Sequence, residues 1–392
     1  MAIFQRHPDI NKSVEICRIP SRFVNAESAR LKFGSVADRL APYLMYGDPL
    51  ADKLVHRLHT LPSGQGEQLV LQAMNSGIQS IRRPPKELVN FFENVERVPL
   101  WVDWEQLAQG GAAILRAGHL ALLVLGCYAL PLSYSSPDGN KPLMYTRKLI
   151  EMASRRLIQT ANYVLEVCRP DGLQQGNTGY RISIRVRLMH AQVRRLLLRK
   201  GNWKLNEWGL PINQADMLGT NLLFSIIMVD GLKKLGFQLS NDEIEAIISL
   251  WRYAGFLIGI QGNIGVTSFK EGWRIVNIIR ATNNPANEDS ILLVNALRGS
   301  LIEIANFLPN EVIDVAKLQL FLMFISRYLL GDELADQLHI EKNHYSIFLP
   351  PVFGGVSILS YFSKIIPFLH ELAIKEGIQT WEKFTELSKH FQ

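Results

Sequence analysis

The sequence predicts an all-α protein, a large single-domain helical bundle, and three observations support this. Apolar residues recur at helical spacing along most of the chain, and no stretch shows sustained alternation of apolar and polar residues between hairpin turns. The chain has 392 residues, of which 47% are hydrophobic and 20% charged, so it can bury a substantial core. No long segment is both poor in apolar residues and highly charged, so extended disorder is not expected.

The individual elements follow from apolar periodicity and from start and stop signals. An irregular arm is expected at 1–35. Pro84-Pro85 precede one helix, and Pro131 is expected to end a long helix before a turn-rich loop at 133–142. A glycine-rich loop follows 144–168. The predicted helices are 36–45, 49–60, 66–76, 83–98, 104–130, 144–168, 180–200, 213–235, 241–260, 289–305, 311–330, 333–340, 353–376 and 377–390.

Two similar hexapeptides occur far apart in the chain, GDPLAD at 47–52 and GDELAD at 331–336. In each, an aspartate followed by apolar positions predicts the capped start of a helix. No fixed period of 20–50 residues runs through the sequence, so the two boxes do not indicate a repeat protein.

Charge and hydropathy restrict the partners and the compartment. The net charge of +6 is spread over the chain and no nucleic-acid-reading module is present, so nucleic acid is not an expected partner. The first residues contain no continuous apolar region, and the most apolar run, Leu120–Leu132, is shorter than the roughly 20 residues that a membrane span needs. We expect a cytoplasmic protein without a transmembrane span, with association at a membrane surface as the alternative.

The segment 144–168 carries a polar pair beside its apolar stripe. Arg156 and Thr160 are four residues apart and therefore lie on one helix face, next to the stripe that contains Leu157 and Ala161. Burial of an arginine is costly unless an anionic group meets it. The alternative is an arginine whose stem is buried while its head remains in solvent.

His190 is the candidate metal ligand in the segment 180–200. It lies at the edge of an apolar stripe that is expected to be buried and includes Val186, Met189 and Val193. A hydrogen-bonded core histidine is the alternative interpretation. Elsewhere, Gly255 and Gly259 are four apart in an apolar helix, where either a flat cofactor or a neighbouring helix could approach closely. The three cysteines form no C-x-x-C pair, so a structural zinc site is not supported.

Several segments, taken in order, resemble the catalytic domain shared by rubber oxygenases (latex-clearing proteins) and the mycophenolic-acid-pathway oxygenases. The resemblance covers roughly residues 45–340. The segments that carry it are RRLIQT at 155–160, RVRLMHAQVR at 185–194, WGLPINQADMLGT at 208–220, LLFS at 222–225, WRYAGFLIG at 251–259 and YLLGDELADQL at 328–338.

This resemblance implies an all-α fold that encloses one haem b, with His190 as the proximal iron ligand. Arg156 matches the family's arginine and Thr160 its threonine, both on the opposite side of the haem. We add three expected cofactor contacts, namely Arg187 and Arg194, which lie on either side of His190 in sequence, and Gly255.

Two positions depart from the family's pattern. Latex-clearing proteins have a lysine before the threonine, able to occupy the distal haem position, whereas Gln159 stands here. Gln159 is therefore expected to modulate access to an open iron. Rubber oxygenases also place a catalytic glutamate upstream of the arginine, where this chain has Asn140. Glu151 is the nearest acid and is the candidate substitute.

The expected activity is oxidative cleavage of a carbon–carbon double bond in an apolar isoprenoid or lipid-like substrate by molecular oxygen. The expected parts are an N-terminal arm and first helix at 1–44, a catalytic domain at 45–340 and a helical extension at 341–392. One alternative is a non-catalytic haem- or lipid-binding protein of the same fold, which the residues at 140 and 159 favour. Another is a helical interaction protein without a cofactor.

Overall fold

The computed structural model describes residues 19–146, 152–307, 314–342 and 349–391. These residues form helices and no β-strand, so the predicted all-α class is confirmed. The α-helices are α1 Ala26–Phe33, α2 Pro49–Leu58, α3 Gln65–Ser76, α4 Lys86–Glu96, α5 Trp104–Arg116, α6 His119–Val124, α7 Leu130–Tyr134, α8 Lys141–Thr146, α10 Ala153–Cys168, α11 Thr178–Arg199, α12 Leu205–Trp208, α13 Gln214–Leu222, α14 Met228–Lys234, α15 Asn241–Leu257, α16 Phe269–Thr282, α17 Glu288–Ala305, α18 Val315–Leu330, α19 Asp332–Gln337, α20 Leu349–Ile365 and α21 Pro367–Glu386.

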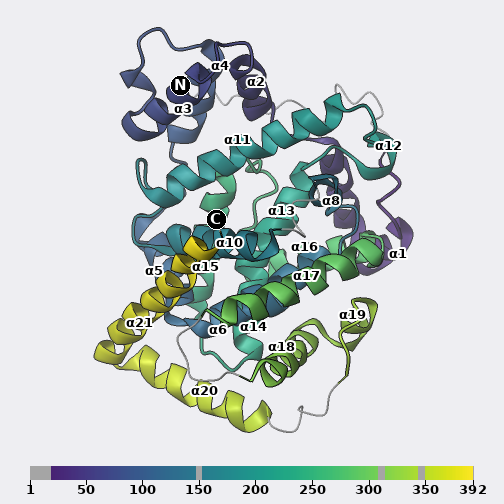
Figure 1. Cartoon of the computed structure of the whole chain (residues 1–392), viewed down its shortest axis with the longest axis vertical. Coiled ribbons are helices and arrows are strands. Elements are labelled where there is room, and N and C mark those ends of the chain that lie inside the picture. The colour runs from purple at the N-terminus through teal and green to yellow at the C-terminus, as the bar shows by residue number, and fades with distance from the viewer. Residues whose placement is uncertain (1–18, 147–151, 308–313, 343–348, 392) are drawn as a thin grey trace.

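The long helix α11 separates α2, α3 and α4 from the rest of the molecule (Figure 1). Helices α2, α3 and α4 lie on one side of it, and α10, α5 and α15 lie on the other. Helices α18, α19 and α20 form the opposite end, and α21 returns from that end to pack against α5 and α10. Residues far apart in sequence therefore meet at α10 and α11.

Two successive glycines allow α5 to pack closely against two neighbours. A Cβ atom on Gly110 would lie 2.3 Å from the carbonyl oxygen of Ala246 in α15. A Cβ atom on Gly111 would lie 2.1 Å from the carbonyl oxygen of Cys168 in α10. Because no side chain fits at either position, α5 brings α15 and α10 together in the core.

The predicted helix 104–130 is wrong in two respects. It breaks after Arg116, because Gly118 adopts a positive φ of 49°, and the following helix turns away by 85°. The second part also continues past Pro131 to Tyr134, through the π-helical turn η4 (Leu125–Ala129). Pro131 lies just after this π-helical turn, as the second residue of α7.

Other boundaries also differ from the prediction. Residues 26–33 of the predicted irregular arm form α1, and 36–45 forms two 3₁₀ segments, η1 (Gly34–Arg39) and η2 (Ala41–Met45). The predicted helix 144–168 corresponds to the end of α8 and to α10, with 147–151 outside the described residues. Helix α16 was not predicted. The C-terminal pair divides at Pro367, which begins α21, instead of near 376.

One described helix, Gln214–Lys234, is long and apolar enough to cross a membrane, although 78% of its most apolar stretch of 18 residues is buried inside the protein. This helix contains the π-helical turn η5 (Leu223–Ile227) between α13 and α14. Two bent helix pairs would also be long and apolar enough if each pair is taken as one span. They are α5 with 119–134, and 352–365 with 367–390. The expected absence of a span stays a prediction, as does the division at residues 44 and 340.

Candidate functional site

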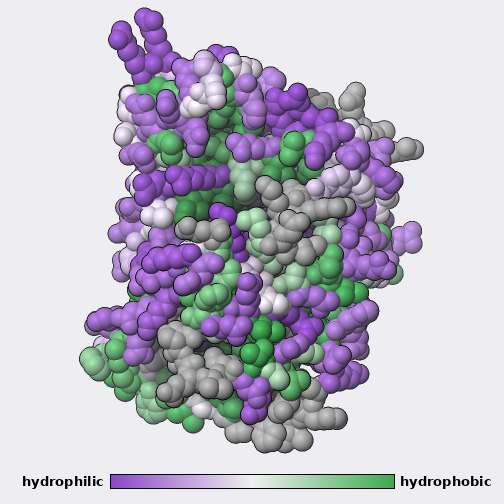
Figure 2. Space-filling model, in the orientation of Figure 1, coloured by the Kyte–Doolittle hydropathy of each residue, from purple (hydrophilic) through white to green (hydrophobic). Residues whose placement is uncertain are grey.

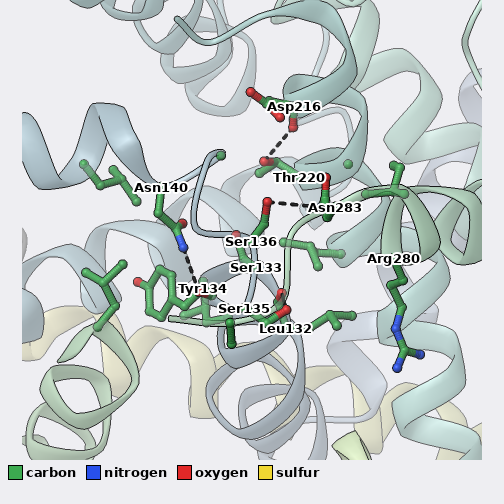
Figure 3. A pocket seen from close by; sticks show the side chains of 18 of the residues that line it. Leu132, Ser133, Tyr134, Ser135, Ser136, Asn140, Asp216, Thr220, Arg280 and Asn283 are labelled. Atoms are coloured by element: carbon green, nitrogen blue, oxygen red, sulfur yellow. Dashed lines mark hydrogen bonds between the residues drawn. The ribbon is translucent and has the colours of Figure 1, made fainter. Parts of the chain in front are cut away.

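A cavity of about 940 Å³ lies among α10, α11, α13, α16 and α17, with the loop after α7 as one wall (Figure 3). This volume is at the upper end of the roughly 300–1,000 Å³ typical of small-molecule sites. Its lining combines aliphatic and aromatic side chains with hydroxyl, amide and guanidinium groups. Among the lining residues are Leu157, Met189, Val193, Leu223, Phe224, Ile258 and, as polar members, Tyr134, Ser135, Asn140, Arg156, Thr160, His190, Thr220, Arg280 and Asn283.

Part of the predicted apolar stripe of α11 faces this cavity instead of the core. The sequence predicted that Met189 and Val193 are buried, but both line the cavity and Met189 is exposed. The buried face of α11 instead contains Ile184, Leu188 and Ala191. An apolar helix face next to a hollow space is what a ligand site requires, because a ligand can then cover it.

His190 also lines the cavity from α11, with its ring half-buried. Its Nδ1 atom is enclosed and has no hydrogen-bond partner among the described residues. Nε2 is therefore the ring nitrogen available to the cavity. Burial, together with the positive charge of nearby Arg194, lowers the pKa of His190 to about 4. The imidazole is consequently neutral at pH 7 and is able to coordinate a metal.

The lowered pKa of His190 makes stability depend on pH. In the unfolded chain the imidazole has its ordinary pKa of 6.5, and in the folded protein about 4. Between these values the unfolded state binds more protons, so the free energy of unfolding is expected to fall, by on the order of 1–3 kcal/mol, as the pH drops from about 6.5 to about 4. Urea unfolding at pH 7 and pH 4.5 should show this loss in the wild type and a smaller loss in His190→Gln. Equal losses in the two proteins would contradict the assignment.

Arg156 and Thr160 line the same cavity from α10. The Thr160 hydroxyl donates to the carbonyl oxygen of Arg156 at 2.9 Å, which fixes it along the helix and leaves its oxygen free to accept a further hydrogen bond. The Arg156 guanidinium forms no ion pair or hydrogen bond within the described part of the chain. Burial lowers the pKa of Arg156, and the nearby Tyr134 opposes this shift. The sequence prediction that these three side chains share one site agrees with their placement.

The sequence also predicted two other catalytic residues on the helix 144–168, Gln159 and Glu151. Gln159 is exposed and is not among the residues that line the cavity, which corrects its predicted effect on access to the iron. Glu151 lies outside the described residues. Asn140 is buried at the cavity wall, where its Nδ2 donates to the carbonyl oxygen of Tyr134 at 2.7 Å (Figure 3).

Acidic side chains are few at this cavity. Of the described lining residues, only Asp216 and Glu333 are acidic. Asp216 accepts two hydrogen bonds from Arg22, at 2.8 and 2.9 Å, and Glu333 is exposed. Sequence reasoning missed the Arg22–Asp216 pair because the two residues are far apart in the chain. It also missed Tyr134, although this residue lies within the turn-rich loop predicted at 133–142.

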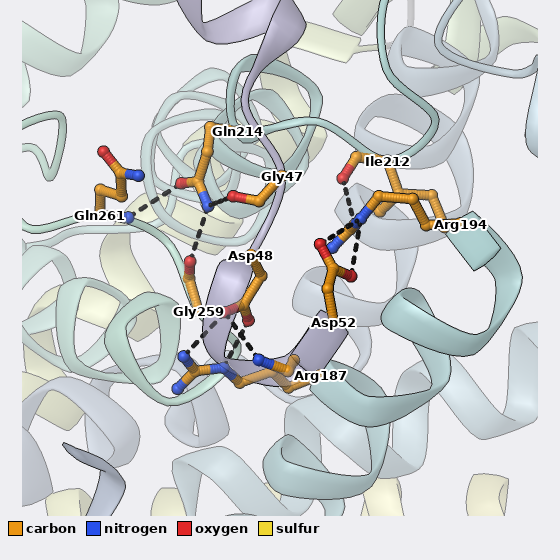
Figure 4. A network of polar contacts seen from close by, with 10 residues as sticks. Gly47, Asp48, Asp52, Arg187, Arg194, Ile212, Gln214, Gly259 and Gln261 are labelled. Carbon is orange, nitrogen blue, oxygen red and sulfur yellow. Dashed lines mark hydrogen bonds and ion pairs between the residues drawn. The ribbon is translucent and has the colours of Figure 1, made fainter. Parts of the chain in front are cut away.

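Arg187 and Arg194 do not line the cavity, which corrects their prediction as cofactor contacts. Both are buried on the side of α11 that faces α2 (Figure 4). Arg187 donates to both carboxylate oxygens of Asp48, through Nε at 2.6 Å and Nη2 at 3.1 Å. Arg194 donates to Asp52 through Nε and to the carbonyl oxygen of Ile212 through Nη1 at 2.9 Å. These arginines hold α11 in place, because each satisfies a carboxylate from α2 or its cap.

Gly255 likewise does not line the cavity. A Cβ atom there would meet Asn221 and Ile260 at 3.2–3.3 Å, so close helix packing, the alternative left open by the sequence, explains this glycine. Gly259 has φ of 93°, and a Cβ atom there would lie 2.3 Å from the Asp48 carboxylate. Its carbonyl oxygen accepts from Gln214, which links the loop after α15 to the same network (Figure 4).

Among the described residues there is no group of three or more histidine, cysteine, aspartate or glutamate side chains that could hold a metal ion. A metal at this cavity would have to bring most of its ligands with it. A porphyrin does so, and leaves the iron in need of a single axial protein ligand. His190 fits that requirement, since it is neutral, lines the cavity beside Met189 and Val193, and has no competing partner among the described residues.

Comparison with known proteins agrees with this architecture. A sequence model of the family described as "ER-bound oxygenase mpaB/B'/Rubber oxygenase, catalytic domain" matches residues 104–349, more than half of the chain. The chain belongs to this family. The match includes α10 and α11, and with them Arg156, Thr160 and His190.

Two relatives of the oxygenase family illustrate how far the similarity extends. The rubber oxygenase of Streptomyces sp. (strain K30) is 22% identical over 264 residues, which are 66% of this chain and 61% of that protein. This chain thus matches less than two thirds of that relative's length. The structure of latex clearing protein LCP in the closed state superimposes with a TM-score of 0.63 at 17% identity, covering 88% of this chain and 91% of that one. It shares the fold.

Proposed function

We propose that this protein is a haem b-dependent oxygenase that cleaves a carbon–carbon double bond in an apolar, isoprenoid or lipid-like substrate. The observation that carries the proposal is the neutral, unpartnered imidazole of His190 at a large cavity in a chain of the oxygenase family. When bound there, haem would supply the activation of molecular oxygen.

The residues around His190 suit this task. Val193 and Met189 offer apolar surface beside the imidazole, and Phe224, stacked on Trp251 at 4.8 Å, offers a rigid apolar wall. Such a lining excludes water from the reacting groups and accepts an apolar substrate. Arg156 contributes a positive charge, and its N–H donors have no partner among the described residues. It can therefore stabilise negative charge that develops on oxygen, with the Thr160 hydroxyl as a neighbouring hydrogen-bonding group.

A non-catalytic haem- or lipid-binding protein is the second candidate function. The observation in its favour is the amide of Asn140 at the cavity wall, engaged with the Tyr134 carbonyl, where the family resemblance implies a glutamate. An amide cannot act as a general base at neutral pH.

Haem reconstitution followed by substrate turnover tests the proposal. The purified protein, titrated with haemin, is expected to develop a Soret band at one haem per chain. With an isoprenoid alkene and oxygen, the loaded protein is expected to release carbonyl products, detected by mass spectrometry. A Soret band without products would favour the binding protein. A colourless protein that takes up no haemin would overturn both the haem-dependent oxygenase and the haem-binding protein.

A further inference from the structure

On an ordinary surface helix the polar face is turned to solvent, whereas on α20 the polar face is turned to the protein and the apolar face to solvent. Its polar side chains face the protein: Ser357, Ser360 and Ser363 follow one another at a spacing of three. Gln238 donates through Nε2 to Ser357 Oγ at 2.7 Å and through its backbone N–H to Ser360 Oγ at 3.0 Å. The buried guanidinium of Arg116 donates to Ser363 Oγ at 3.3 Å. These hydrogen bonds hold the polar face of α20 against the protein.

The outward face of α20 and the start of α21 is correspondingly apolar. Every exposed residue from 352 to 368 is a glycine, a proline or a large apolar or aromatic residue. Leu359 exposes 73% of its surface and Phe368 exposes 71%. A contiguous exposed apolar surface of this kind marks an interaction site. The apolar patch consists of Ile358, Leu359, Tyr361, Phe362, Ile365 and Phe368.

The shape of this apolar patch is a convex corner. Helices α20 and α21 meet at 114° next to Pro367, at the edge of the molecule (Figure 1), and apolar side chains gather over this corner in Figure 2. A rigid protein partner would need a matching concave surface, whereas a fluid hydrocarbon layer adapts to any convex shape. Aromatic side chains at the corner are typical of residues that sit at the boundary between lipid and water.

The charges around the apolar patch match an anionic lipid surface. Residues 349–370 contain no aspartate or glutamate, and the first acidic residue is Glu371. Lys364 lies within this stretch, and the α21 face that also carries Phe368 holds Lys375 together with Glu371. Lysines beside an apolar helix face keep their ammonium groups at the headgroups while their stems lie along the apolar surface. The net charge of +6 adds a general attraction to anionic membranes.

We propose that the apolar patch docks this protein on an anionic lipid bilayer, with α20 lying in the plane of the membrane surface. Spanning is not involved, because the 17 residues of α20 extend only about 25 Å, short of a hydrocarbon core of roughly 30 Å, and its polar face is held by the protein. This inference goes beyond the proposed chemistry and does not depend on haem.

Vesicle sedimentation of the full chain tests this docking. Wild-type protein is expected to sediment with vesicles of phosphatidylcholine and phosphatidylglycerol. The double variant Leu359→Gln, Phe368→Gln is expected to partition at least about tenfold less, because two exposed apolar side chains no longer enter the lipid. The matched control is Leu31→Gln, Leu100→Gln, which replaces two leucines that are 91% and 106% exposed outside the patch and should sediment like wild type.

Three outcomes would overturn the proposal. The first is wild-type protein that remains in the supernatant. The second is an equal loss of sedimentation in the control variant, which would mean that exposed leucines act without regard to position. The third is a wild-type dimer, seen by light scattering, that the patch variant converts to monomer, because a second copy would then be the occupant. Unchanged helicity by circular dichroism confirms that the patch variant is folded, and Leu359→Gln alone provides a milder replacement with the same expected direction.

Discussion

The His190→Ala protein is expected to bind haemin at least about 100-fold more weakly than wild type while keeping its helical content. Loss of a partner that merely orients a metal ligand costs roughly 10–100-fold in affinity, and here the ligand itself is removed. His190 is the only histidine among the described residues that line the cavity, and none of these lining residues is a cysteine. Haemin titration monitored at the Soret band measures the effect.

Two further variants sharpen this test of His190. His56→Ala removes an exposed histidine from α2 and should titrate like wild type. His190→Gly leaves space beside the cavity, so added imidazole is expected to restore the Soret band to this variant and not to change the wild type. Full haem binding by His190→Ala would remove this residue as the ligand.

Periodicity was sufficient for the long helices that bury one face. Helices α10, α11, α15 and α17 were predicted because their apolar residues recur at the helical period over four or more turns. Helix α16 was missed, although its start signal is present: Ser268 caps the helix by accepting from the backbone N–H of Glu271. The break at Gly118 was missed because one glycine in an apolar run carries no information about its φ angle until tertiary contacts are known.

For the candidate site, the three residues that match the family's pattern lie at the cavity, whereas those assigned by closeness in sequence do not. His190, Arg156 and Thr160 were assigned by resemblance, and they line one cavity. Arg187 and Arg194 were assigned because they are close to His190 in sequence, and this failed because a helix turns neighbouring side chains to different sides. The sequence marked Asp48 only as a helix cap, which it is, since it accepts from the backbone N–H of Ala51. Its pairing with α11 depends on contacts across 139 residues, which no local pattern contains.

Removal of Arg187 is expected to produce the largest loss of stability in this chain. The side chains of Arg187 and Asp48 are only 4% and 6% exposed, and they are joined at 2.6 Å. Arg187 also lies over the ring of Phe91 at 4.8 Å. Replacement by methionine leaves the Asp48 carboxylate buried without its partner, and such broken pairs cost about 3–5 kcal/mol. Urea unfolding at pH 7 measures this cost.

A double-mutant cycle separates the pair from the packing around it. In Asp48→Asn the helix cap is retained, because asparagine also caps helices, but Arg187 loses its anionic partner. The double variant Asp48→Asn, Arg187→Met is expected to lose less stability than the sum of the single variants, since neither charge remains unpaired. Arg30→Met is the matched control. It breaks the exposed Arg30–Asp38 pair and should leave the unfolding midpoint unchanged.

The same cycle tests how α2 supports the candidate site. Arg187 lies one turn before His190 on α11, so a shift of the helix on loss of the Asp48 contact would move the imidazole relative to α10. Haemin affinity is therefore expected to fall in Arg187→Met even under conditions where the protein remains folded, and to recover in part in the double variant. If Arg187→Met unfolded at the same urea concentration as Arg30→Met, the buried pair would not be what fixes α11. The position of His190 would then have to depend on the other contacts of α11, among them the Arg194–Asp52 pair and the packing against α10 and α15.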